Sequence, residues 1–168
     1  MGLDVYLYGR KIGALEPATA TDYTFEYSDA IVEEMEEGTI ALSQSLPVQA
    51  GPYGPPATRS YFEGLLPESA RREELARELQ VSVNDSYALL ARIGRDCAGA
   101  VVIFPEEEQP ATGADSGVEW LPTERLTELV EELPRKPLGI TRANSKLRLS
   151  LAGVQRKLAL VRDEGGRF

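Results

Sequence analysis

Side chains that alternate between apolar and polar types, with a period of two residues, constrain this chain more than any other sequence feature. Residues 23–27 are Tyr-Thr-Phe-Glu-Tyr, so every second side chain is aromatic, as in a strand with one buried face. The same reasoning predicts strands at residues 5–8, 12–15 and 40–43, with a tight turn at Gly9. We expect the three aromatic rings to form the core of an antiparallel sheet and not a cage for a ligand.

Helical spacing of apolar residues begins after a loop rich in proline and glycine at residues 47–56. Residues 71–80 have one apolar face, formed by Leu75, Ala76 and Leu79. A second helix is expected to start at a cap supplied by Asn84 or Asp85 and to end at Gly94. Its inward residues are predicted to be Tyr87, Leu90 and Ala91.

Three further segments complete the pattern. Residues 100–104 are apolar and largely β-branched, which predicts a buried strand, and residues 105–117 are expected to form an acidic surface loop. Thr123 is expected to cap a helix that Pro134 stops. Its inward residues are predicted to be Leu126, Leu129, Val130 and Leu133. These elements together predict the α+β class, an antiparallel sheet with attached helices.

Charge is distributed unevenly along the 168 residues, whose net charge is −9. Residues 1–133 hold 9 basic and 25 acidic residues, a balance of −16, whereas residues 134–168 hold 9 basic and 2 acidic residues, a balance of +7. A basic segment next to an acidic body indicates a local role with anions, or else a segment that docks on its own body. Nucleic acid is a weaker inference, because the acidic body would repel a phosphate backbone.

A single cysteine, Cys97, rules out a disulfide within the chain and favours a reducing cytoplasm. Its small neighbours predict a buried structural residue and not a reactive thiol. No apolar run approaches the roughly 18 residues of a membrane span, and residues 1–10 do not resemble a secretory signal.

The segment at residues 146–161 carries the features closest to chemistry. Two apolar runs flank Ala152 and Gly153, whose small side chains let backbone N–H groups approach an anion closely. Arg156 and Lys157 add positive charge, and Ser150 adds a hydroxyl group. The segment matches neither a P-loop nor the glycine loop of ordinary protein kinases, and a plain β-hairpin fits it equally well.

Three stretches taken together resemble a known family. They are YFEGLLPE at 61–68, LLARIGRDCAGAV at 89–101 and SLAGVQRK at 150–157. Their order and spacing are similar to the N-terminal region of HipA-type serine/threonine kinases, the toxins of HipBA toxin–antitoxin modules. The resemblance implies an N-terminal subdomain at residues 1–136, followed at residues 137–168 by the glycine-loop β-hairpin that begins an ATP-binding kinase domain.

The resemblance also implies an activity, namely transfer of the γ-phosphate of ATP, with Mg²⁺, to a protein serine or threonine. The best-known target of the family is glutamyl-tRNA synthetase, an aminoacyl-tRNA synthetase, and its inactivation causes growth arrest and persistence. The implied partner is a HipB-like helix-turn-helix antitoxin, and DNA is contacted only through it. The residues implied to cover the ATP phosphates are Ala152, Gly153, Val154, Gln155, Arg156 and Lys157, and Ser150 matches the serine that such kinases autophosphorylate.

The catalytic groups that such a kinase needs are expected to follow the loop, and no histidine is present for an H-x-D catalytic loop. We therefore expect a fragment of a longer kinase, without catalytic residues and inactive by itself. Two alternatives stay open: a free-standing binding or regulatory protein of a split toxin–antitoxin system, and an unrelated acidic interaction domain.

Overall fold

The computed structural model describes residues 1–19, 21–97, 100–106, 108, 120–132, 162–163 and 165. The chain divides into two compact units, Met1–Pro110 and Ala111–Phe168, and each is described by itself. The predicted glycine-loop hairpin lies outside the described residues, and the predicted domain boundary between residues 136 and 137 stays a prediction.

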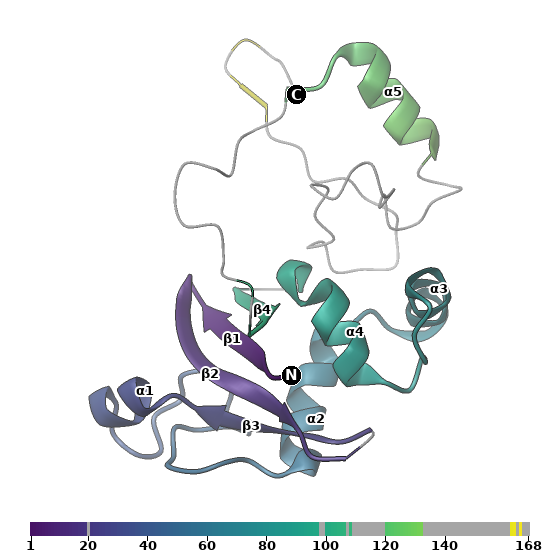
Figure 1. Cartoon of the computed structure of the whole chain (residues 1–168). Coiled ribbons are helices and arrows are strands. Elements are labelled where there is room, and N and C mark those ends of the chain that lie inside the picture. The colour runs from purple at the N-terminus through teal and green to yellow at the C-terminus, as the bar shows by residue number, and fades with distance from the viewer. Residues whose placement is uncertain are drawn as a thin grey trace. The chain divides into compact units, whose positions relative to one another are not determined.

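The first unit is built on a four-stranded antiparallel sheet with the strand order β3-β2-β1-β4 (Figure 1). The strands are β1 (Leu3–Leu7), β2 (Arg10–Pro17), β3 (Tyr23–Tyr27) and β4 (Val101–Pro105). The sheet therefore places the last strand beside the first. The α+β class is confirmed, and so are the strands predicted at the start of the chain, at residues 23–27 and at residues 100–104.

A two-residue turn joins β1 to β2. Tyr8 has a φ of 51° and Gly9 a φ of 80°, which are the positive values that type I′ hairpin turns require at both central positions. Gly9 takes this conformation without strain, whereas Tyr8 does so with its side chain 86% exposed. The predicted turn is confirmed, although Tyr8 belongs to the turn and not to the strand.

The strand predicted at residues 40–43 is wrong. Ile40 is 59% exposed, and Ser43 makes only an isolated bridge to Leu46. These residues lie in a long loop between α1 (Asp29–Glu34) and α2 (Pro55–Phe62). The short helix α1 was not predicted from the sequence. The apolar run at residues 40–42 is short enough to lie in a loop, and the buried residues that anchor this loop are Leu46 and Val48.

Two tyrosines hold this loop against the sheet. The Tyr27 hydroxyl donates to the Leu46 carbonyl at 2.6 Å, and the Tyr53 hydroxyl donates to the Pro47 carbonyl. Tyr53 also exchanges two backbone hydrogen bonds with Phe25, at 2.7 and 3.3 Å. The outer edge of β3 is thereby paired at this position, which removes part of an open sheet edge.

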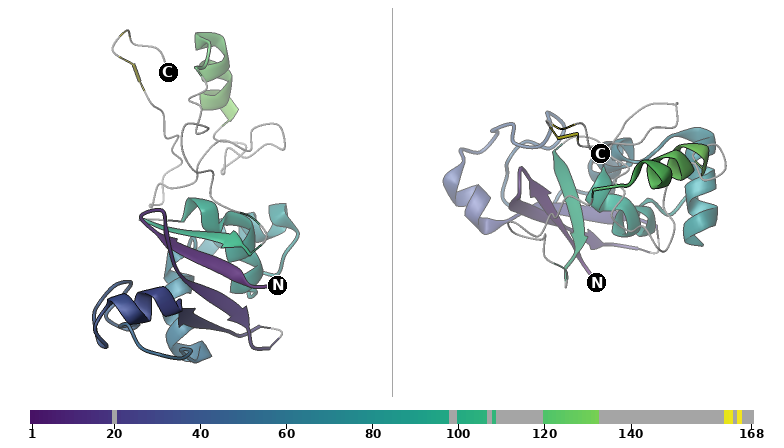
Figure 2. Two further views of the ribbon diagram at one scale, coloured as in Figure 1. Left: turned by 60° about the vertical axis from the view of Figure 1, so that its left-hand side comes forward. Right: turned by 90° about the horizontal axis from the view of Figure 1, so that it is seen from above.

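Helices α2 and α4 (Ser86–Ile93) cover one face of the sheet, as Figures 1 and 2 show. The register places Val5, Tyr27 and Ile103 on that face, and all three are buried. Phe62 of α2 meets Phe25 with ring centroids 5.4 Å apart. The prediction that the aromatic residues of β3 form the sheet core is confirmed, because residues 23, 25 and 27 are all buried.

The remaining elements of the first unit connect these layers. They are the 3₁₀ turns η1 (Glu63–Leu65) and η2 (Gly94–Asp96) and the helix α3 (Ser69–Leu79). The predicted helix at residues 71–80 is confirmed, with Leu75 and Ala76 buried. The loop predicted to run to residue 56 ends earlier, because Pro55 and Pro56 occupy the first helical positions of α2, where a missing N–H is tolerated.

The start of α4 settles which of two residues is the cap. The Ala88 N–H donates to Asp85 Oδ1 at 2.9 Å, so Asp85 is the cap and Asn84 is not. Gly94 follows the helix as predicted, and a Cβ there would lie 2.5 Å from the Cβ of Ile103. The inward face is shifted from the prediction: Tyr87 and Ala91 are half-buried, and the buried residues are Ser86, Leu89, Leu90 and Ile93.

In the second unit the structure describes α5 (Thr123–Glu132). Thr123 is its first residue, and the Pro122 carbonyl accepts the Leu126 N–H at 3.0 Å. The inward prediction is wrong for Val130, which is 52% exposed, and Leu126 is half-buried. The predictions for Leu129 and Leu133 concern side chains outside the described part. Among the described residues, no helix is long and apolar enough to cross a membrane.

Candidate functional site

The residues predicted to contact ATP, at positions 152–157, and the predicted autophosphorylation site Ser150 all lie outside the described residues. Their predicted roles therefore stay predictions. The first unit contains two of the three stretches that carry the family resemblance, and its described residues form a polar hollow.

The stretch at residues 61–68 ends α2 and forms η1. Its apolar side chains enter the core, where Phe62 is 0% and Leu66 4% exposed. Glu63 has a different environment, because its carboxylate lies among arginines at the surface. This stretch therefore contributes Phe62 and Leu66 to the core and Glu63 to a network of ion pairs at the surface.

The stretch at residues 89–101 packs the end of α4 and η2 against β4. The guanidinium of Arg95 lies 5.0 Å from the centre of the Phe104 ring and pairs with Glu108. Cys97 is 4% exposed, which confirms the prediction of a buried cysteine. The described part of this stretch supports the sheet and holds no reactive group at the surface.

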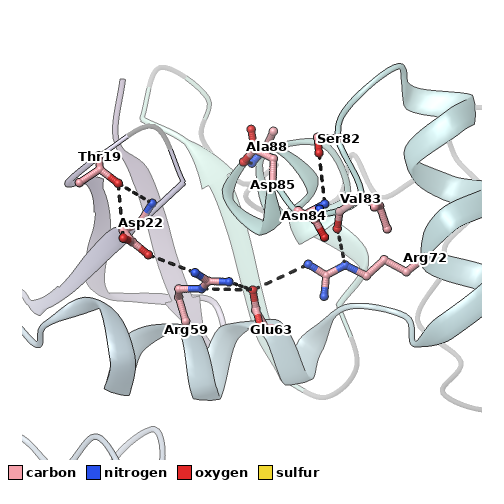
Figure 3. Close-up of polar contacts among 10 residues, drawn as sticks. All are labelled: Thr19, Asp22, Arg59, Glu63, Arg72, Ser82, Val83, Asn84, Asp85 and Ala88. Carbon is pink, nitrogen blue, oxygen red and sulfur yellow. Dashed lines mark hydrogen bonds and ion pairs between the residues drawn. The ribbon is translucent and has the colours of Figure 1, made fainter.

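A network of ion pairs links four segments of the first unit (Figure 3). Arg59 of α2 bonds Asp22, which precedes β3, at 3.1 Å and Glu63 at 2.9 Å. Arg72 of α3 lies 3.8 Å from the same Glu63 carboxylate, and its Nε donates to the Val83 carbonyl at 2.9 Å. The network therefore ties the β2–β3 turn, α2, α3 and the α3–α4 loop together.

An open hollow of about 390 Å³ lies at this network. The residues that line it are Arg59, Glu63, Ser69, Arg72, Glu73, Val83 and Asn84. Ser69, the first residue of α3, has a φ of 50°, and no side chain caps the N-terminus of that helix. Both charged and neutral hydrogen-bonding groups therefore face this hollow.

Two hydroxyl groups are buried near Glu63. The Tyr23 and Ser86 side chains are 0% exposed, and neither hydroxyl has a hydrogen-bond partner of normal geometry among the described residues. Burial raises the pKa of Tyr23, and the nearby Ser86 hydroxyl offsets part of this rise. Ser86 also lies close enough to interact with the Glu63 carboxylate.

The ionisation of Glu63 reflects its neighbours. Burial would raise the pKa of its carboxyl, but the hydrogen bonds from Arg59, the nearby Ser86 hydroxyl and the charges of Arg59 and Arg72 together outweigh burial. The pKa of Glu63 is accordingly held below its usual range, and the group stays charged at neutral pH.

The charged and neutral polar groups of this hollow can hold a ligand by ion pairs and hydrogen bonds. The described residues contain no group of three His, Cys, Asp or Glu side chains that could hold a metal ion. The whole sequence lacks histidine, so no imidazole acts as an acid or base at the hollow.

Sequence reasoning missed this network. The spacing of Arg59 and Glu63, four positions apart, is a signal for an ion pair on a helix. The bond between Asp22 and Arg59 spans 37 positions and has no local signal.

The chain is similar to a known domain family and to proteins named as kinases. The family model of the HipA N-terminal domain matches residues 3–104, which contain β1 to β3, α2 to α4 and all of β4 except Pro105. A protein of Sinorhizobium fredii named "Putative kinase Y4mE" is 37% identical over 166 residues, covering 97% of this chain and 39% of that protein.

The serine/threonine-protein kinase toxin HipA of Shewanella oneidensis is 29% identical over 159 residues, covering 94% of this chain and 34% of the toxin. A solved structure of Shewanella oneidensis HipA with HipB and operator DNA matches 98% of this chain and 37% of that chain. Its TM-score is 0.67 and its identity 25%.

An uncharacterized protein of Haemophilus influenzae is 28% identical over 104 residues, which are 62% of this chain and 92% of that protein. The chain thus spans well under half the length of the relatives that are named as kinases, whereas its match covers nearly the whole length of the Haemophilus influenzae protein.

Proposed function

This chain belongs to the HipA N-terminal domain family, and from that premise we propose that it forms the N-terminal portion of a HipA-like toxin serine/threonine kinase. One observation carries the proposal. Similarity to a kinase-named relative runs over 97% of the chain, and so continues beyond the domain at residues 3–104 into the segment that holds Ser150 and Lys157.

The segment at residues 152–157 supplies the ATP contacts in this proposal. Small side chains at Ala152 and Gly153 let backbone N–H groups reach phosphate oxygens, which is how glycine-rich loops bind anions. Val154 and Gln155 continue the loop, and Arg156 and Lys157 bring positive charge to the triphosphate. Mg²⁺ would accompany ATP, held by residues of the complete kinase.

Ser150 is the proposed regulatory position. A phosphate there carries a charge near −2 beside Arg148, Arg156 and Lys157, and it competes with ATP for the same donors. Phosphorylation of Ser150 would then switch the kinase off.

The proposed partners follow from the relatives. The similar solved structure is of a HipA with HipB and operator DNA, so we propose a HipB-like helix-turn-helix antitoxin as partner, with DNA contacted only through it. The proposed substrate is a translation component such as an aminoacyl-tRNA synthetase, the place of action is the cytoplasm, and the outcome is growth arrest.

The test uses the full-length protein that contains this chain. Its induction should arrest bacterial growth, co-expression of the neighbouring antitoxin should restore growth, and the purified kinase should label a cellular protein from [γ-³²P]ATP. Normal growth of induced cells together with no labelled protein would disprove the proposal. The 168-residue chain by itself should label nothing, because it spans no more than 39% of the kinase-named relatives.

A second function is favoured by the short Haemophilus influenzae relative, 92% of which aligns with this chain. A protein of that length holds the N-terminal domain without a kinase lobe. On this alternative the domain binds and restrains a separate kinase of a split system. Addition of the purified chain to its cognate kinase separates the two: inhibition of phosphorylation supports the regulator, and no effect supports the kinase portion.

A further inference from the structure

Strand β4 ends the sheet on one side. Among the residues that the structure describes, its one neighbour in the sheet is β1, so no strand lies beside its second edge. Such an edge pairs readily with a strand of another chain unless it is blocked or covered. The sequence of β4, Val-Val-Ile-Phe-Pro, is apolar and contains no charged residue that would block this pairing.

Backbone hydrogen bonds show which groups of β4 face β1. The Ala100 carbonyl accepts the Tyr8 N–H at 3.3 Å, and the Glu106 N–H donates to the Gly2 carbonyl at 3.1 Å. The backbone groups of successive residues in a strand point to opposite sides, so the N–H and C=O groups of residues 102 and 104 also face β1. The groups of residues 101, 103 and 105 therefore face away from it.

These outward groups are buried, although they lie at the edge of the sheet. Pro105 has no N–H, and its carbonyl accepts the Glu108 N–H at 2.8 Å. Val101 is 5% and Ile103 0% exposed. The outward N–H and C=O groups of these two residues are therefore shielded from another chain.

The 3₁₀ turn η2 lies against this edge. A Cβ at Gly94 would lie 2.5 Å from the Ile103 Cβ and 3.0 Å from the Ile103 carbonyl oxygen, so a residue without a side chain is needed here. The next residue, Arg95, places its guanidinium 5.0 Å from the centre of the Phe104 ring and pairs with Glu108. Two consecutive residues of η2 thus contact β4.

We propose that η2 is an edge cover, which prevents β4 from pairing with β4 of a second copy of this chain. The uncovered edge would be complementary to itself. In an antiparallel pair related by a two-fold axis, Val101 of one copy lies opposite Ile103 of the other, and the four hydrogen bonds of the two pairs satisfy all of their outward groups. All of these residues belong to the first unit, so the edge cover does not depend on the ATP-binding segment.

The first test is amide hydrogen exchange of the 168-residue chain, followed by NMR. Gly94→Ala forces a Cβ against Ile103 and should raise the exchange rates of the Val101 and Ile103 amides by about 5- to 150-fold, the range that corresponds to overpacking a tight contact. The amides of Val102 and Phe104, which face β1, should keep their rates. An equal rise at all four amides, or no rise at any of them, would overturn the proposal.

A matched glycine and a second variant accompany this measurement. Gly64→Ala should leave the exchange rates of β4 unchanged, because nothing lies within 4 Å of a Cβ at Gly64. Arg95→Ala removes the cation over Phe104 without adding an atom, so it tests the edge cover even where Gly94→Ala does not fold. It should raise the rates of the same two outward amides, and unchanged rates in Arg95→Ala would count against the proposal.

The second test is the association state, measured by sedimentation velocity over a range of concentrations. Gly94→Ala should self-associate more strongly than the wild type. Adding Val102→Lys to this variant should reverse the association, because the two lysines would lie opposite each other across the two-fold axis. Wild-type association in folded Gly94→Ala, or association that the lysine does not reduce, would show that η2 does not exclude a second copy.

Discussion

Glu63 shows how one side chain links two helices, α2 through Arg59 and α3 through Arg72. Its carboxylate accepts two N–H groups of Arg59 at 2.9 and 3.3 Å and lies 3.8 Å from Arg72. Removal of the charge leaves both arginines without their shared counter-ion. We expect Glu63→Gln to lower the free energy of unfolding at pH 7 by about 1.5–3 kcal/mol, the range for hydrogen bonds to charged groups.

The same residue sets a pH dependence. The folded-state pKa of Glu63 is lowered, so its stabilisation is fully present above the unfolded-state pKa of about 4.3 and is lost as pH falls through the folded value. We expect urea unfolding between pH 7 and pH 3 to show that the wild type has a higher free energy of unfolding than Glu63→Gln at neutral pH. This difference should disappear below about pH 4.5. A gap that stays constant over this range would contradict the role of ionisation. Glu78→Gln serves as the control.

Two buried tyrosines of β3 allow a matched comparison of what a hydroxyl hydrogen bond contributes to stability. Tyr27 donates a 2.6 Å hydrogen bond to the Leu46 carbonyl, whereas the Tyr23 hydroxyl has no partner of normal geometry among the described residues. Tyr27→Phe should therefore cost about 1–2 kcal/mol, because it leaves a buried carbonyl unpaired. Tyr23→Phe should cost clearly less, and thermal unfolding of both variants measures the difference. An equal loss would show that Tyr23 is bonded as well as Tyr27 is.

At the scale of elements, the start of α4 depends on one cap. Asp85 accepts the Ala88 N–H, and the neighbouring Asn84 side chain makes no capping bond. Asp85→Ala should lower the free energy of unfolding by about 1 kcal/mol, and Asn84→Ala should change it by less than about 0.5 kcal/mol. Chemical denaturation of the two variants side by side provides the measurement. The reverse order would move the cap to Asn84.

Sequence periodicity predicts some helices and strands correctly and others wrongly. Residues 23–27 and 71–80 are predictable because their burial follows from neighbours in the sequence. Residues 40–43 have the same local pattern as a strand, but a strand also needs a partner, and the partner that β1 uses is at residues 101–105. The polar network cannot be predicted from local sequence for the same reason, since Asp22 and Arg59 come into contact only when α2 packs against the sheet.

For the complete protein, the ATP contacts proposed for residues 152–157 can be tested at Ser150 and Lys157. Ser150→Asp in the full-length kinase should weaken ATP binding strongly, because a fixed negative charge diverts Arg156 and Lys157 from the phosphates, each charged bond being worth roughly 1.5–3 kcal/mol. Ser150→Ala should disturb binding less, and Lys157→Ala should weaken it without unfolding the protein. Calorimetric titration with ATP measures all three. Wild-type affinity in Ser150→Asp would refute the regulatory role of this position.

The place of β1 in the sheet has a consequence for synthesis on the ribosome. β1 pairs with β2 as soon as that hairpin emerges, but its other edge waits for β4, and 94 positions separate Leu7 from Val101. At translation rates of 5–20 residues per second, that edge stays unpaired for about 5 to 20 seconds. For this interval the nascent chain presents an unpaired strand edge, which can pair with another chain until β4 is synthesised.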